Sequence, residues 1–288
     1  MRVFFVDTDS ELIYSDVDKF GLELIKMPYI LDGVEYYDDA GRNINYDDFF
    51  EQLKVGKSCK TAALNTQNYL DLFEPHFAAG NEIFYLHFSS EMSATFEFMN
   101  TAISQLKEKY PKVSFRTFDT KSISIGAGIQ CYYAGKMYKE GKSFDEIIKF
   151  LEGFSSKAAC FFVVDDLDFL KKGGRITGMA AFAGKLLGIK PVLHVNDEGK
   201  IVKYDTVRGK SKVVDYLVNL VVENRIDNNE YGVWVAYTAD SVDIAKTIVS
   251  KLKVLYPCAE ITGQQIGPVV GTHCGPGTSG VIFYSKIR

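Results

Sequence analysis

The side chains best suited to chemistry in this sequence are two arginines and a histidine that lie next to predicted turns. Arg175 follows Gly173 and Gly174, which are expected to end a short helix, because glycine takes the left-handed cap conformation without steric cost. Arg208 closes a predicted hairpin, and His273 lies in a glycine-rich loop. Such groups bind anions, and a histidine whose pKa is near neutrality also transfers protons. A buried helix and hairpin that carry arginines on the protein surface would explain Arg175 and Arg208 equally well.

Two hydroxyl side chains lie where a ligand could be held. Ser93 follows a predicted strand at the point where a helix begins, and Thr61 precedes a helix that is expected to start near Thr66. A hydroxyl at a helix start caps free backbone N–H groups, whereas a helix N-terminus at the carboxyl end of a parallel strand also binds anions. For Ser93 both interpretations stay open, and Thr61 taken alone is a loop threonine.

Several patterns that would indicate an enzyme are incomplete. Cys274 is next to His273, but adjacent side chains seldom point the same way, so a nucleophile–base pair is not expected. Asp7 and Asp9 follow the first predicted strand. They are interpreted as helix caps rather than metal ligands, because no further carboxylates have ligand spacing. The sequence contains no P-loop, GxSxG or HExxH motif, so we expect no cofactor, no metal and no catalytic residue acting on its own.

The composition is that of a globular protein of about two domains. Of the 288 residues, 47% are hydrophobic and 24% are charged, which is ordinary. The net charge of −4 and the lack of a basic run exclude non-specific nucleic-acid binding. The five cysteines form no CxxC pair, so reduced thiols in a cytoplasm are expected. No apolar segment approaches the ~18 residues of a membrane span, and the N-terminal run is too short for a signal peptide.

The first part of the chain, residues 1–157, alternates strand-like and helix-like segments. Its predicted elements include strands at Val3 to Val6, Glu82 to Phe88 and Val113 to Phe118 and a helix at Phe144 to Phe154. Such alternation predicts a parallel sheet covered by helices on both faces. Residues 30–60 are polar and break this pattern, so they are expected to form an excursion between two strands of the sheet.

The second part, residues 158–288, has a different order of elements. Its predicted elements are strands at 159–164, 232–237, 260–266 and 281–284, helices at 167–172, 176–187, 209–224 and 241–255, and a hairpin at 189–207. Antiparallel pairing with helices on one face is expected. The small side chains of the helix at 176–187 would let a thin apolar ligand approach closely. The predicted fold class is therefore α/β, with an N-terminal parallel-sheet sandwich and a C-terminal α+β domain whose sheet is largely antiparallel.

Taken in order, these motifs resemble those of the DegV family, the fatty-acid-binding subunits of bacterial fatty acid kinase. The matching segments are Asp7 to Leu12, Ser89-Ser90 through Ser93-Ala94-Thr95, Asp119 to Ser122, Leu170 to Ile176, Leu187 to Pro191, Val207-Arg208-Gly209 and His273-x-Gly275-Pro276-Gly277. The resemblance covers essentially the whole chain. The order of KKGGRI, IKP, VRG and HxGPG is specific, whereas each motif alone is not.

The resemblance implies two α/β domains with a fatty acid between them. It implies that Thr61 and Ser93 hold the carboxylate of the fatty acid. It also implies that Arg175, Arg208 and His273 lie near that carboxylate and serve phosphotransfer or the docking of a separate kinase. The partner kinase would bind ATP and form acyl phosphate on the bound lipid.

The leading hypothesis is a cytoplasmic carrier that presents the carboxylate of a long-chain fatty acid to an ATP-dependent kinase and has no turnover alone. Burying an alkyl chain yields ~0.8 kcal/mol per CH₂, or about 12 kcal/mol for sixteen carbons before ordering costs. Two alternatives remain. One is a self-sufficient acyl- or phosphoryl-transferase that uses His273 or Cys274, and the other is a module that binds another small organic anion. The chain departs from the family pattern beside the expected head-group site, at Ala62, Ala63, Leu64 and Ala94.

Overall fold

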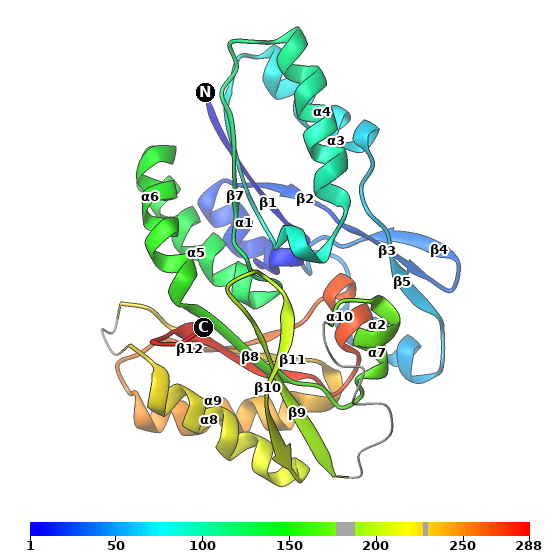
Figure 1. Ribbon diagram of the computed structural model, residues 1–288, viewed down its shortest axis with the longest axis vertical. Helices are drawn as coiled ribbons and strands as arrows, with labels where there is room; N and C mark the ends of the chain where they lie inside the picture. The colour runs from blue at the N-terminus through cyan, green and yellow to red at the C-terminus, as the bar shows by residue number, and fades with distance from the viewer. Residues whose placement is uncertain (177–187, 227–229) are drawn as a thin grey trace.

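The structure of the protein is a computed structural model that describes residues 1–176, 188–226 and 230–288. It contains a parallel sheet and a larger, mostly antiparallel sheet, which confirms the predicted fold class. The two sheets occupy the upper and lower halves of Figure 1, and α5 (Ile125–Lys139) lies between them. The division at residue 157 stays a prediction. Within the described ranges, no helix is long and apolar enough to cross a membrane.

The parallel sheet has four strands in the order β2-β1-β6-β7. Their bounds are β1 (Arg2–Asp7), β2 (Glu23–Ile25), β6 (Glu82–His87) and β7 (Phe115–Asp119). The predicted strands at 3–6, 82–88 and 113–118 are thus confirmed to within a few residues. The side chains of the two central strands, β1 and β6, are buried on both faces, as is typical of a parallel sheet between helices.

Helices cover both faces of this sheet, as predicted. One face packs against α3 (Thr66–Ala78) and α4 (Thr95–Lys109), and the other packs against α1 (Tyr14–Phe20), α5 and α6 (Phe144–Phe154). The bounds of α6 agree with the prediction because Ser143 and Glu146 form a reciprocal capping box, which fixes the first turn of a helix.

The larger sheet has six strands in the order β10-β9-β8-β13-β11-β12. Their bounds are β8 (Ala158–Val163), β9 (Ile189–Val195), β10 (Ile201–Arg208), β11 (Val233–Tyr237), β12 (Ile261–Gln265) and β13 (Ser279–Tyr284). All neighbours pair antiparallel except β11 and β12, which are parallel. One face is covered by α8 (Val213–Asn224) and α9 (Val242–Leu255), which confirms the predicted hairpin and the helices on one face.

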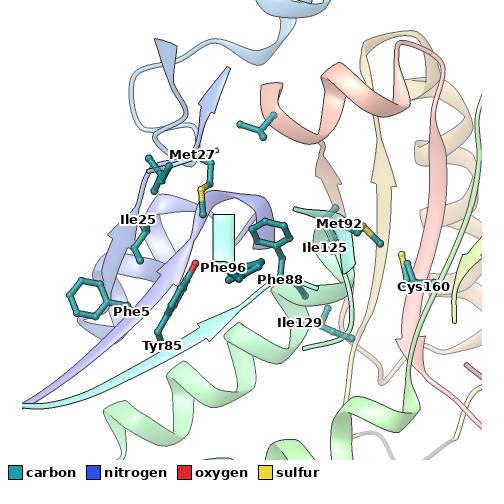
Figure 2. Close-up of a cluster of buried hydrophobic side chains, with 14 of the residues drawn as sticks. Phe5, Ile25, Met27, Tyr85, Phe88, Met92, Phe96, Ile125, Ile129 and Cys160 are labelled. Atoms are coloured by element: carbon teal, nitrogen blue, oxygen red, sulfur yellow. The ribbon is translucent and has the colours of Figure 1, made fainter. Parts of the chain in front are cut away.

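The other face of the six-stranded sheet joins the core of the parallel sheet. Because side chains alternate along a strand, Phe161 of β8 faces the α8–α9 layer, whereas Cys160 and Phe162 face the parallel sheet. Figure 2 shows this shared core, in which Met92 and Cys160 turn toward each other. The seam between the sheets is therefore lined by apolar side chains from both halves of the chain.

Residues 30–60 form structure of their own at one side of this seam. They contribute to a three-stranded antiparallel sheet in the order β4-β3-β5. Its elements and their neighbours are β3 (Pro28–Leu31), β4 (Val34–Tyr37), β5 (Cys59–Thr61), α2 (Tyr46–Lys54), α7 (Asp168–Gly173) and α10 (Pro268–Cys274). The predicted excursion is confirmed in place, between β2 and β6 along the chain.

Two predictions for this region have different outcomes. His273 was expected in a glycine-rich loop, but it lies in the last turn of α10, which starts with Pro268, a residue favoured at the first position of a helix. The predicted helix at 176–187 falls on residues that lie outside the described ranges, apart from Ile176, which makes a β-bridge to Ile201.

Candidate functional site

A cavity of about 170 Å³ lies in the seam between the two large sheets. Its walls are mostly apolar and come from both halves of the chain; they include Met92, Cys160, Phe162, Ala236, Val269 and Ile282. Its polar lining includes four of the five residues predicted for the site: Thr61, Ser93, Arg175 and His273. The fold thus gathers residues that are up to 212 positions apart in the sequence.

Thr61 and His273 are in direct contact. Oγ1 of Thr61, at the end of β5, lies 2.9 Å from Nε2 of His273. The pairing of Thr61 with Tyr29 of β3 holds β5 in place, and β5 in turn packs against α10. The other ring nitrogen of His273, Nδ1, is buried and has no hydrogen-bond partner among the described residues. The threonine hydroxyl and the imidazole are therefore coupled by one contact in the lining of the cavity.

His273 is a neutral imidazole at physiological pH, which corrects the expectation of a pKa near neutrality. Loss of solvent lowers its pKa to about 4, and the positive charge of Arg175 lowers it further, because both effects disfavour the imidazolium ion. The ring is therefore suited to giving or accepting a hydrogen bond, and it is not a proton donor at pH 7.

The capping role that the sequence left open for Ser93 is observed, whereas its anion-binding role stays a prediction. Ser93 lies two residues before Thr95, the first residue of α4, and its Oγ accepts a hydrogen bond of 3.2 Å from the backbone N–H of Thr95. The half-buried Ser93 also lines the cavity. Since the Oγ–H hydrogen is not used by the cap, it remains available to an anion in the cavity.

The two predicted arginines lie in different places. Arg175 follows α7, whose left-handed cap is Gly174, and it lines the cavity while its Nε donates to the carbonyl oxygen of Met92 at 3.2 Å. Its side chain also donates to the carbonyl of Gly173. Arg208 is the exposed last residue of β10 and lines neither this cavity nor a second one beside it.

The acidic turn after β1 has one member that sequence reasoning missed. Asp7 caps the turn, with Oδ1 accepting from the N–H of Ser10 at 2.9 Å, as predicted. Asp9 lines the cavity, and its buried Oδ1 has no hydrogen-bond partner among the described residues. Burial and the neighbouring carboxylates Asp7, Asp38 and Glu11 raise the pKa of Asp9 well above its ordinary value. Asp9 therefore lines the cavity as a neutral acid. The residues next to it in the sequence do not indicate this.

Cys274 is a poor candidate for a nucleophile. It is buried and lines the cavity, and burial raises the pKa of its thiol to about 12. A thiol that stays protonated is not a nucleophile at neutral pH. In the described part of the chain no carboxylate hydrogen-bonds His273 to orient it as a base, so the triad geometry of a self-sufficient transferase is not assembled there.

The fold and the cavity together define a class: α/β proteins whose two large sheets enclose a mostly apolar cavity with a few polar side chains in its lining. The family model described as "Uncharacterised protein, DegV family" matches residues 4–286. The chain is also 34% identical over 286 residues to a DegV domain-containing protein of Clostridium perfringens, covering 99% of this chain and 98% of that protein. The chain belongs to the DegV family.

Solved structures share the fold over almost the whole chain. A fatty acid binding DegV family protein from Streptococcus agalactiae is 27% identical, with a TM-score of 0.84 and 98% of each chain covered. A DegV family protein from Thermus thermophilus, described by its fatty acid binding, is 25% identical, with a TM-score of 0.82 over 99% of this chain and 100% of that one.

Proposed function

We propose that this protein binds a long-chain fatty acid in the cavity between the sheets and presents the carboxylate to a separate ATP-dependent kinase. The observation that carries the proposal is a mostly apolar cavity whose polar lining includes Thr61, Ser93, Arg175 and His273. A ligand that fits has a long apolar part and one anionic end. Relatives of known structure that bind fatty acids support the same assignment.

The carboxylate would be held by hydrogen bonds, because an unpaired anion in a cavity of this kind becomes protonated instead. The neutral His273 would donate from Nε2 to Oγ1 of Thr61, 2.9 Å away. The hydroxyl hydrogen of Thr61 is then free to point at the ligand, as is that of Ser93. Arg175, whose guanidinium lines the same cavity, would supply the balancing positive charge.

The kinase would supply ATP, because the chain carries no nucleotide-binding motif. In the transfer step a carboxylate oxygen forms a bond to the γ-phosphorus. The bond from that phosphorus to the bridging oxygen breaks, and ADP leaves with the electron pair. The product is an acyl phosphate, an activated acyl group suited to phospholipid synthesis. Arg175 would offset the charge of the new phosphoryl group, the exposed Arg208 would contact the kinase, and the site of action would be the cytoplasm.

The test is reconstitution with a fatty acid kinase and radiolabelled ATP. Label is expected in a lipid-extractable, hydroxylamine-sensitive product only when this protein, the fatty acid and the kinase are all present. Release of labelled product by this protein without the kinase would overturn the carrier assignment and favour a self-sufficient transferase. No label in the complete mixture, with proof that the lipid is bound, would overturn the kinase partnership.

A further inference from the structure

A second cavity of about 550 Å³ adjoins the first. It lies between the segment that follows α2 and the helix α7, and it is lined by Thr61, Arg175 and His273, which also line the first cavity. The two cavities therefore meet at the Thr61–His273 contact, where the carboxylate of the fatty acid is proposed to lie. A group attached to that carboxylate would enter the second cavity.

The second cavity is basic. Lys57 borders it on one side and Lys172 of α7 on the other, with Arg175 where the two cavities meet. No aspartate or glutamate is present among its described lining residues. This local charge is notable in a chain whose net charge is −4, and it attracts anions.

The ion pairing of Lys57 and Lys172 differs from that of a neighbouring lysine. Lys54, at the nearby end of α2, pairs with Glu51 at 2.8 Å and with Asp240 at 2.5 Å. By contrast, neither Lys57 nor Lys172 forms an ion pair with a residue in the described ranges. Their charge is therefore available to a ligand.

A third lysine also borders the second cavity. Lys60 borders the same cavity from β5, but Cys59 and Thr61 on either side of it both turn their side chains to α10, through Thr272 and His273. Because successive side chains on a strand point to opposite faces, the Lys60 side chain projects from the face of β5 opposite to Thr272 and His273, and its charge adds to the basic character of the cavity lining.

We propose that the second cavity is the subsite for the phosphoryl group of an acyl phosphate, held by Lys57, Lys172 and Arg175 while its acyl chain occupies the first cavity. This inference rests on the proposed function, because it assumes a fatty acid in the first cavity. The physical reason is charge. A carboxylate carries one negative charge, whereas an acyl phosphate carries about two. The neutral His273 cannot balance the additional negative charge.

The experiment is calorimetric titration of the lipid-free protein with two ligands of equal chain length. One is the fatty acid, and the other is an acylphosphonate, in which a carbon–phosphorus bond replaces the labile oxygen bridge. Wild-type protein is expected to bind the phosphonate about tenfold more tightly than the acid at low salt, with the preference shrinking as ionic strength rises. Lys57→Gln combined with Lys172→Gln should remove this preference and leave the affinity for the fatty acid within about twofold.

Lys54→Gln is the matched control and should change neither affinity, because Lys54 does not line the second cavity and its charge is paired with Glu51 and Asp240. The subsite is overturned if wild-type protein shows no preference for the phosphonate, or if the double variant loses both ligands equally. It is also overturned if inorganic phosphate alone competes as well as the phosphonate, because that would mean a free anion site unconnected to the acyl chain. Binding of neither lipid would instead refute the proposed function, and the inference with it.

Discussion

Burial changes the chemistry of the individual residues around the cavity. His273 loses its positive charge because its pKa falls to about 4, and Cys274 stays a thiol because its pKa rises to about 12. Asp9 stays neutral because its pKa also rises. Each of these groups is therefore a hydrogen-bonding partner rather than an ion or a nucleophile at neutral pH. Arg175 is left as the positive charge in the lining of the cavity.

Ser93→Ala is expected to weaken fatty-acid binding roughly tenfold, because a hydrogen bond to a charged group contributes about 1.5–3 kcal/mol. A loss of stability of about 1 kcal/mol should accompany it, since the Ser93 Oγ also caps the backbone N–H of Thr95. Calorimetric titration and thermal unfolding measure the two effects. Ser90→Ala is the control, because the Ser90 Oγ bonds Asp119 and does not line the cavity. Unchanged affinity in the Ser93 variant would refute its role.

Arg208→Ala is expected to leave fatty-acid affinity within about twofold and to slow phosphorylation by the kinase about tenfold or more. The reason is position: Arg208 is exposed at the end of β10 and lines neither cavity. The measurement compares lipid titration with the initial rate of acyl-phosphate formation. An equal loss of binding and rate would contradict this separation of roles.

At the level of elements, the position of His273 depends on the close contact between α7 and α10. Gly173 is the last residue of α7, and a Cβ atom there would overlap the imidazole of His273 at Nδ1. The absence of a side chain at residue 173 is therefore what lets the imidazole lie against α7 and reach Thr61.

Gly173→Ala is expected to displace His273 and weaken fatty-acid binding roughly tenfold, at a stability cost of about 1–3 kcal/mol from overpacking. The control is Gly153→Ala in the exposed last turn of α6, where a Cβ meets nothing within 4 Å. That variant should gain about 0.5–1 kcal/mol. A Gly173 variant with wild-type affinity would show that the imidazole is not needed in its present place. Binding by titration and stability by chemical denaturation measure the effects.

The elements that follow from local sequence were predictable, whereas their assembly into the site was not. α6 was placed at its observed bounds because the Ser143–Glu146 capping box and the helical spacing agree. β1 was visible as a short apolar run. The helix around His273 was missed because α10 spans only seven residues and is flanked by glycines, so its periodic signal is weak.

The contact between Thr61 and His273 is beyond any local pattern. It depends on the pairing of β5 with β3 and on the packing of β5 against α10, which bring together residues 212 positions apart. All residues of β4 are exposed, and those of β5 are exposed or half-buried. An alternation of apolar and polar residues therefore did not reveal these short strands. The family resemblance pointed to both residues, but their mutual distance required the structure.

At the scale of the whole molecule, several buried carboxyls make stability depend on pH. Burial raises the pKa of Asp7 and of Asp38 from 3.8 to about 7, and that of Glu11 from 4.5 to about 8. The folded protein thus binds these protons more tightly than the unfolded chain does. The resulting stability is fully present below the unfolded pKa values and is lost as pH rises through the folded ones.

The free energy of unfolding is therefore expected to fall as pH rises from about 4 to about 8, by about 1.4 kcal/mol per pH unit for each carboxyl that is protonated in the folded state and ionised in the unfolded chain. Glu11→Gln should make this slope shallower by about that amount for one group, since the amide oxygen can accept from the N–H of Gly267 and the amide NH2 can donate to Oγ of Ser124. Denaturant unfolding across the pH series measures the slope. The exposed Glu108→Gln is the control, and a slope as steep in the Glu11 variant as in wild type would contradict the prediction.

The cavity between the two sheets is the feature on which the account of function depends. Mass spectrometry of the protein under native conditions, followed by organic extraction and identification of the released molecule, tests it most directly. We predict one long-chain fatty acid per chain, displaced when Ser93 and Thr61 are both replaced by residues without a hydroxyl. A polar ligand in the extract, or a protein that stays empty when long-chain fatty acids are supplied in excess, would contradict the account.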